Sequence, residues 1–94
     1  MRLSNNELMT LRQVLQAADP AGRIYLFGSR TDDARKGGDI DVFLEASCDL
    51  NLRARLALES RLTHLCGTKV DLLVKNPTSP EMPIFEIARR GVPL

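Results

Sequence analysis

Two aspartates, Asp39 and Asp41, stand two positions apart in a segment that otherwise reads as a β-strand, Asp39 to Glu45. Successive side chains of a strand point to opposite faces of the sheet, so the two carboxylates share one face. Like charges this close repel each other unless a positive charge lies between them. Carboxylate oxygens suit Mg²⁺, which typically binds one or two carboxylates together with substrate phosphates. The pair therefore indicates a divalent-metal site.

A Gly-Ser turn, Gly28-Ser29, separates an apolar run from the paired aspartates. Gly permits close backbone approach, and a short helix after Ser29 would point free N–H groups toward an anion. Ser29 could instead act only as a helix cap, but the carboxylates downstream favour phosphate binding. Arg30 is a further candidate phosphate contact, with simple solvation of its charge as the alternative. A phosphate binder and a metal binder close together predict a nucleoside triphosphate site.

Asp71 is the only acid in a third apolar segment, which we expect to form a strand over 68–74. A lone Asp in a buried strand usually lies at the wet end of the strand or serves a function. Asp71 is therefore a candidate third carboxylate of the same site.

Gly28-Ser29, then Asp39-Ile40-Asp41, then an isolated Asp in a later strand form a pattern that resembles the nucleotidyltransferase superfamily of DNA polymerase β and kanamycin nucleotidyltransferase. The short chain resembles the minimal nucleotidyltransferases, which are often paired with a helical HEPN-domain protein. The resemblance covers nearly the whole chain, including the closing segment 87–92.

The resemblance implies a fold, a reaction and a partner. Two Mg²⁺ ions would be held by Asp39, Asp41 and Asp71, and an NTP, expected to be ATP, would bind at Gly28, Ser29 and Arg30. An acceptor hydroxyl would attack the α-phosphorus and expel pyrophosphate. In HEPN pairs the nucleotidyltransferase can act as an antitoxin that transfers AMP to a hydroxyl of the toxin.

Other readings stay open at this point. A non-catalytic antitoxin could mask its partner by contact alone, although the intact set of three aspartates weighs against this. A phosphohydrolase that uses water as the acceptor is a weaker possibility. The acceptor (protein, RNA or small molecule) and the formation of a homo-oligomer are not fixed by the sequence.

Length and composition limit the class of protein and its location. The 94 residues predict one domain, 1–94, and the net charge of +1, from 13 basic and 12 acidic residues, gives no basic excess for wrapping a duplex. No apolar run approaches about 18 residues, and residues 1–7 lack the apolar core of a signal peptide. Cys48 and Cys66 fit no metal or redox spacing and read as reduced cysteines. We therefore expect a cytoplasmic protein.

The periodicity predicts a small mixed β-sheet covered by helices, an α/β (α+β) fold. Ser4 and Glu7 form a capping box for a helix over 5–18. Asp49 is the expected cap of a second helix over 50–66 that ends at Gly67. The expected elements are a helix 5–18, strands 23–27 and 39–45, a helix 50–66, a strand 68–74, and a helix 83–90 followed by Gly91.

Burial was predicted from the same patterns. In the second helix, the main core stripe is Ala54, Leu58, Leu62 and Leu65. Leu52 and Leu56 fall nearly opposite, where we expect packing against a terminal helix, with a partner contact as the alternative. Ile84, Ile87 and Ala88 should face the core, and Glu45 should be exposed. His64 has no second ligand at metal spacing, so no zinc site is expected.

Overall fold

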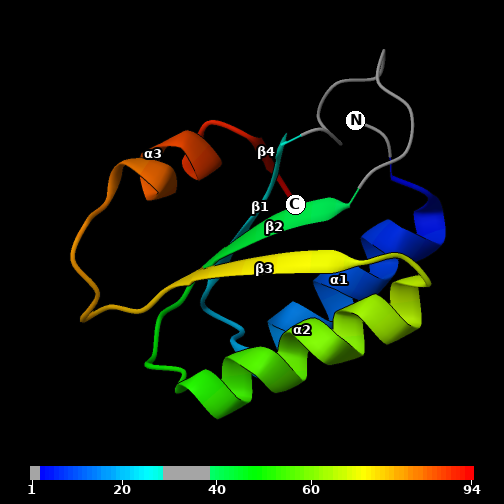
Figure 1. Ribbon diagram of the computed structural model, residues 1–94, viewed down its shortest axis with the longest axis horizontal. Helices are drawn as coiled ribbons and strands as arrows, with labels where there is room; N and C mark the ends of the chain where they lie inside the picture. The colour runs from blue at the N-terminus through cyan, green and yellow to red at the C-terminus, as the bar shows by residue number, and fades with distance from the viewer. Residues whose placement is uncertain (1–2, 29–38) are drawn as a thin grey trace.

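The computed structural model describes residues 3–28 and 39–94. Within these ranges the elements follow in the order α1 (Asn5–Ala18), β1 (Arg23–Phe27), β2 (Ile40–Glu45), α2 (Leu52–Cys66), β3 (Val70–Lys75), α3 (Pro83–Arg89) and β4 (Val92–Pro93). The strands form a mixed sheet in the order β3-β2-β1-β4. Strand β2 runs parallel to β3 and antiparallel to β1, and β4 pairs antiparallel with β1. The predicted α+β fold is confirmed (Figure 1).

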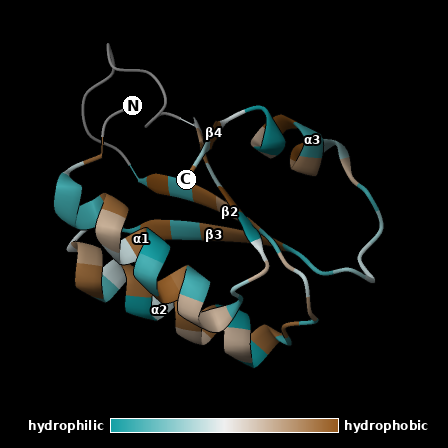
Figure 2. Cartoon of the chain, turned by 180° about the vertical axis from the view of Figure 1, so that it is seen from behind, coloured by the Kyte–Doolittle hydropathy of each residue, from teal (hydrophilic) through white to brown (hydrophobic). Residues whose placement is uncertain are grey.

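The main core lies between the sheet and the helices α1 and α2. Alternate residues of β2 point to this side, and Ile40, Val42 and Leu44 are fully buried there, because β2 alternates with the period of a strand. Leu11 and Leu15 of α1 meet them, one helical turn apart. Figure 2 shows the matching stripes of apolar residues on the two helices.

Helix α1 has the predicted bounds and the predicted start. Ser4 Oγ accepts a hydrogen bond from the Glu7 N–H at 3.1 Å, and Glu7 Oε1 accepts one from the Ser4 N–H at 2.8 Å. This reciprocal capping box satisfies two N–H groups that would otherwise lack a partner at the helix start.

The other face of the sheet is covered in part by α3. Phe43 is fully buried there and stacks between Tyr25 and Phe85, with ring centroids 5.8 and 5.6 Å away. The prediction that Glu45 is exposed is wrong, because α3 folds over this face. Arg89 of α3 donates a hydrogen bond to Glu45 Oε2 at 2.9 Å, which leaves both side chains partly buried.

Helix α2 begins two residues later than predicted. Its N-cap is Asn51, whose side-chain oxygen accepts from the Ala54 N–H at 2.8 Å. Asp49 is not the cap, because its carboxylate accepts a hydrogen bond from the Thr78 hydroxyl, at 3.0 Å. The helix ends as predicted at Gly67, in the left-handed region with φ 68°.

The apolar residues of α2 are less buried than their spacing suggested. Leu62 is fully buried, but Leu65 is 45% exposed. Leu52 and Leu56 are 65% and 55% exposed, so the expected packing against a terminal helix is wrong. Their alternative role as a partner contact stays a prediction.

The face that the last helix turns to the core matches the prediction only in part. Ala88 is buried as predicted, but Ile84 and Ile87 are 40% and 58% exposed, and Phe85 is buried instead. The Phe43 ring is the reason, because it draws the larger Phe85 ring onto the sheet. The predicted end of this helix is at Arg90, and the structure ends it at Arg89.

The short strand β4 was not predicted. Val92 pairs with Leu26 of β1, and a Cβ at Gly91 would collide with the Leu26 carbonyl oxygen. Gly91 therefore permits a close backbone approach at a negative φ rather than a left-handed helix cap. None of the helices in the described ranges has the length and apolar content needed to cross a membrane.

Candidate active site

The parallel pairing of β2 and β3 brings two of the predicted carboxylates together. Asp41 and Asp71 are register partners in this pair, and both are half-buried. Asp39 lies directly before the first residue of β2 and is exposed. The predicted strand over 39–45 is thus one residue shorter, and the shared face of Asp39 and Asp41 stays a prediction.

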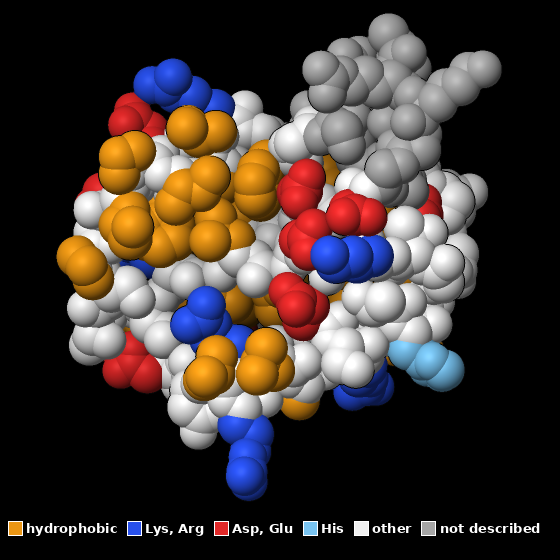
Figure 3. Space-filling model, viewed as in Figure 1, with side chains coloured by type: hydrophobic (Ala, Val, Ile, Leu, Met, Phe, Trp, Pro, Cys, Tyr) orange, Lys and Arg blue, Asp and Glu red, His pale blue; other side chains and the backbone are white. Residues whose placement is uncertain are grey.

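The carboxylates lie on the face of the sheet that α3 covers only in part. Asp41 is opposite Phe27 in the antiparallel β1–β2 pair, two residues from the Tyr25–Phe43 pair. Directly opposite residues of such a pair share a face. The acidic end of this face therefore lies where β2 and β3 begin and β1 ends. Figure 3 shows acidic side chains gathered near the middle of this view, beside the apolar side chains over α3.

The surroundings of Asp41 disfavour its charged form. Burial raises the pKa of Asp41 most, and the negative charges of Asp71 and then Asp39 raise it further. Lys69 Nζ lies 3.7 Å from Asp71 Oδ1, but the two side chains are 67% and 45% exposed, so solvent screens this pair. A site of this kind attracts a cation.

Gly28 brings the end of β1 against the Asp41 carboxylate. Its φ is 76°, a conformation that residues with a Cβ rarely adopt. A Cβ at this position would lie 3.0 Å from Asp41 Cγ and would collide with Asp41 Oδ2. Close backbone approach was predicted for Gly28, and the structure shows that one group it approaches is Asp41. Ser29 and Arg30, the other two predicted phosphate contacts, lie outside the described residues.

The donor set fits Mg²⁺ in its chemistry. Three carboxylates are hard oxygen ligands, and the negative charges of Asp71 and Asp39 help to raise the pKa of Asp41. Over residues 3–28 and 39–94, however, no three His, Cys, Asp or Glu side chains form a ready metal-binding group. That Asp39, Asp41 and Asp71 together hold a metal ion therefore stays a prediction.

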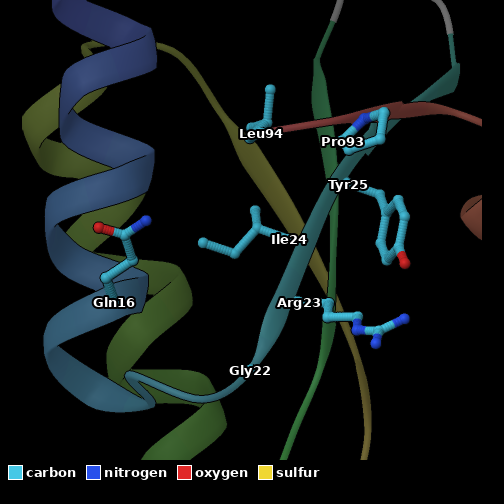
Figure 4. A pocket seen from close by; sticks show the side chains of 7 residues that line it. All are labelled: Gln16, Gly22, Arg23, Ile24, Tyr25, Pro93 and Leu94. Carbon is cyan, nitrogen blue, oxygen red and sulfur yellow. The ribbon is translucent and has the colours of Figure 1, made fainter.

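A surface hollow elsewhere is unrelated to these carboxylates. Figure 4 shows it beside the first residues of β1, where Gln16 of α1 faces Ile24 and Leu94. Arg23, on its wall, pairs with Glu45, whereas Asp41 pairs with Phe27 at the other end of β1. Arg23 and Phe27 are four residue steps apart along β1, or about 13 Å.

Glu59 and Thr63 of α2 were not among the predicted site residues. Both accept hydrogen bonds from the backbone of β3, at Leu72 and Val70, the two neighbours of Asp71. The signal in the sequence was a pair of polar residues four apart, on one face of the helix.

Comparison with protein-family models matches residues 9–94 to the family described as polymerase beta, nucleotidyltransferase. Comparison with curated proteins found no match.

Solved structures of toxin–antitoxin complexes contain similar chains. One, a complex with AMP-PNP, has 31% identity and a TM-score of 0.64, over 73% of this chain and 56% of that chain. A mutant of MntA–HpeT has 26% identity and a TM-score of 0.77, over 99% and 72%. A chain in the complex of a tri-AMPylated Shewanella oneidensis HEPN toxin with an MNT antitoxin has 26% identity and a TM-score of 0.69, over 92% of this chain and 65% of that chain.

This chain spans little more than half the length of the first of these chains. The family match nevertheless covers nearly all of this chain, and the similar structures share its α+β fold. The chain belongs to the polymerase β nucleotidyltransferase family, and the structures it resembles are those of MNT-type antitoxins paired with HEPN toxins.

Proposed function

We propose that this protein transfers AMP from ATP to a hydroxyl of a HEPN-type partner protein and so acts as the antitoxin of that pair. The observation that carries the proposal is the register pairing of Asp41 with Asp71 beside Gly28, with Asp39 at the start of β2. Related complexes support the nucleotide and the acceptor, since one contains AMP-PNP and another an AMPylated HEPN toxin. The reaction belongs in the cytoplasm, where ATP is available.

Each residue has a role in this reaction. Asp39, Asp41 and Asp71 would hold two Mg²⁺ ions, which when bound stabilise the attacking and leaving oxygens of an in-line displacement. Gly28 lets the backbone after β1 approach the phosphates without a Cβ in the way. Ser29 and Arg30 follow it in the sequence and are proposed to bind the triphosphate through a hydroxyl and a guanidinium.

Asp71 lies on β3, whereas Asp41 lies on β2 and Asp39 directly precedes that strand. We therefore assign Asp71 to the acceptor side. It takes the proton of the acceptor hydroxyl as the oxygen bonds to the α-phosphorus. The bond between the α-phosphorus and the bridging oxygen breaks, and pyrophosphate leaves. The protein thus contributes positioning and charge rather than a covalent intermediate.

A labelling experiment tests the proposal. The purified protein is incubated with each α-labelled NTP, Mg²⁺ and a candidate HEPN protein. Label from ATP should move to the HEPN protein, and EDTA or the double variant Asp39→Asn/Asp41→Asn should abolish the transfer. Asp49→Asn is the matched control, because that carboxylate bonds Thr78 and belongs to another loop. Equal labelling by the double variant would refute the assignment. Label on RNA would show that RNA is the acceptor, and release of free labelled AMP would show that water is the acceptor.

A non-catalytic antitoxin is the second candidate, and one observation favours it. Ile84 and Ile87 on α3, and Met82 directly before it, are 40–58% exposed, and such apolar surface often marks a protein contact. The two candidates separate in a growth assay with the toxin. If the double Asn variant protects cells as well as the parent protein, contact alone neutralises the toxin.

A further inference from the structure

Two side chains of α2 hold the outer edge of β3. Thr63 Oγ1 accepts a hydrogen bond from the Val70 N–H at 2.9 Å, and Glu59 Oε2 accepts one from the Leu72 N–H at 2.8 Å. An edge strand otherwise presents such N–H groups without a partner. The two donors are the residues on either side of Asp71. The backbone on both sides of the acceptor-side carboxylate is therefore tied to a helix.

The spacing of the two acceptors matches the spacing of the two donors. Glu59 and Thr63 are four residues apart on α2, which spans about 6 Å along a helix. The outward N–H groups of residues 70 and 72 are two residues apart, which spans about 6.6 Å along a strand. Thr63 also accepts the Gly67 N–H through its carbonyl oxygen, at 3.0 Å, which closes the turn into β3. Helix, turn and strand form one supported unit, with α2 alongside β3 (Figure 1).

We propose that Glu59 and Thr63 are positioning residues, which fix Asp71 relative to Asp41 for nucleotidyl transfer. This inference rests on the proposed function. Asp71 pairs inward with β2 at Asp41, and its two neighbours are bonded outward to α2. The charge of the Glu59 carboxylate strengthens its bond to the N–H group. Without these outward bonds, β3 would be hydrogen-bonded only to β2. The strand could then twist, and Asp71 would shift relative to Asp41.

Protection of a strand edge is the simpler role of such bonds, so the test must distinguish the two. Glu59→Leu and Thr63→Val remove one acceptor each at similar volume, whereas Glu59→Gln and Thr63→Ser keep an acceptor oxygen. Glu86→Leu is the matched control, because Glu86 is exposed on α3 and pairs with Arg90. Amide hydrogen exchange at residues 70–72, nucleotide transfer, and Mn²⁺-induced broadening of the Asp71 amide signal are measured for each variant.

The expected result is a loss of turnover without a loss of nucleotide binding. Glu59→Leu and Thr63→Val should lower kcat by about ten- to a hundredfold, as is typical for groups that orient a ligand. KM for ATP should stay within about twofold of the parent value, because ground-state binding is not the affected step. Exchange at the freed amide should accelerate, Mn²⁺ should broaden the Asp71 signal less, and the Gln and Ser variants should restore most of each property.

Other results overturn the inference. Parent-like kcat in a folded Glu59→Leu or Thr63→Val protein would do so, and unfolding of both would show that the bonds only support the sheet. If the parent protein transfers no nucleotide at all, the proposed function fails. The exchange and Mn²⁺ measurements then decide the inference alone, since unchanged values in both variants refute it.

Discussion

Asp41 and Asp71 are direct register partners across the parallel β2–β3 pair, so two carboxylates from distant parts of the chain lie side by side. Neither has a buried positive partner among the ion pairs of the described residues, since Lys69, beside Asp71, is largely exposed. Such an arrangement costs stability in the absence of a cation, and stability given up at a site is a common mark of function.

Replacement of Asp41 by Asn should therefore raise the melting temperature of the metal-free protein. The variant removes a partly buried charge and its repulsion from Asp71 and Asp39. Mg²⁺ or Mn²⁺ at 100 times its Kd should stabilise the parent by about 2.7 kcal/mol, and this gain should largely disappear in the variant. Calorimetric scans with and without metal measure both effects, with Asp49→Asn as the control. A lower melting temperature of metal-free Asp41→Asn would contradict the expectation.

Gly28→Ala should destabilise the protein by more than about 1 kcal/mol, because its φ is positive and its Cβ would meet the Asp41 carboxylate. Gly67→Ala is a close control, since Gly67 has a φ of 68° but no atom within 4 Å of the added Cβ. The loss at Gly28 should exceed the loss at Gly67. In an Asp41→Ala background, the loss of stability caused by Gly28→Ala should be smaller by at least about 0.5 kcal/mol, whereas the loss caused by Gly67→Ala should be unchanged. Chemical denaturation of the three single and two double variants provides the numbers, and strict additivity at Gly28 would count against the contact.

Local signals predict nearly all of the helices and strands. Helix α1 was predictable because Ser4 and Glu7 bond each other three residues apart, and the end of α2 because Gly67 takes a left-handed conformation. Asp39, Asp41 and Asp71 could be chosen from the sequence, because acids are rare within apolar strands. The strand register that joins Asp41 to Asp71 was not predictable, since it depends on how two distant segments pair.

The failures share one cause, which is packing between segments far apart in the chain. Glu45 read as exposed because nothing near it in sequence shows that Arg89 would reach it. Ile84 and Ile87 read as core residues because an apolar pattern does not show which side of a short helix will meet Phe43. The β4 strand depends on a backbone contact between Gly91 and β1, which no local preference predicts.

Asp19 should make the stability depend on pH in acid. Its side chain is 2% exposed and accepts hydrogen bonds from the Ser47 hydroxyl and from the Ser47 N–H, the latter at 2.7 Å. Burial alone would raise the pKa of Asp19, but the bonds from Ser47 and from the N–H groups of Ala21 and Gly22 lower it overall. Because the folded pKa lies below the unfolded value of about 3.9, this stabilisation is complete above that value and is lost as pH falls through the folded pKa.

Thermal unfolding from pH 7 down to pH values below the unfolded pKa of Asp tests this assignment. Asp19→Asn should be less stable at pH 7 by about 1.5–3 kcal/mol, the usual worth of a hydrogen bond to a charged group. Its stability should fall less steeply than that of the parent in the acid range. Asp49→Asn, at an exposed carboxylate in the loop between β2 and α2, should keep the parent slope. Identical acid slopes for Asp19→Asn and the parent would show that other groups dominate acid unfolding.

Arg89 should anchor α3 to the sheet more firmly than its neighbour Arg90. Arg89 donates to Glu45 at 2.9 Å and to both carboxylate oxygens of Glu81 at 2.7 and 2.9 Å, and its guanidinium lies 6.0 Å from the centre of the Phe43 ring. Lysine cannot make this set of directed bonds. Arg89→Lys should therefore lower the melting temperature and speed amide exchange in α3, whereas Arg90→Lys should change neither. Equal effects of the two variants would show that the bonds of Arg89 are no stronger than an exposed surface pair.

Asp71 should act in the transfer step more than in nucleotide capture, if the proposed function holds. Asp39 and Asp41 flank the first residue of β2, whereas Asp71 lies across the strand pair. An interaction that strengthens only in the transition state affects kcat and kcat/KM equally when it is removed. Asp71→Asn should therefore bind Mg–ATP nearly as well as the parent but transfer AMP about a hundredfold or more slowly, as expected for loss of a general base. Equilibrium binding and single-turnover transfer, measured side by side, separate the two effects, and Asp49→Asn should match the parent in both.

Transfer by Asp71→Asn at the parent rate would remove Asp71 from the site. A large loss of folding stability would instead assign Asp71 to the hydrogen bonding of β3.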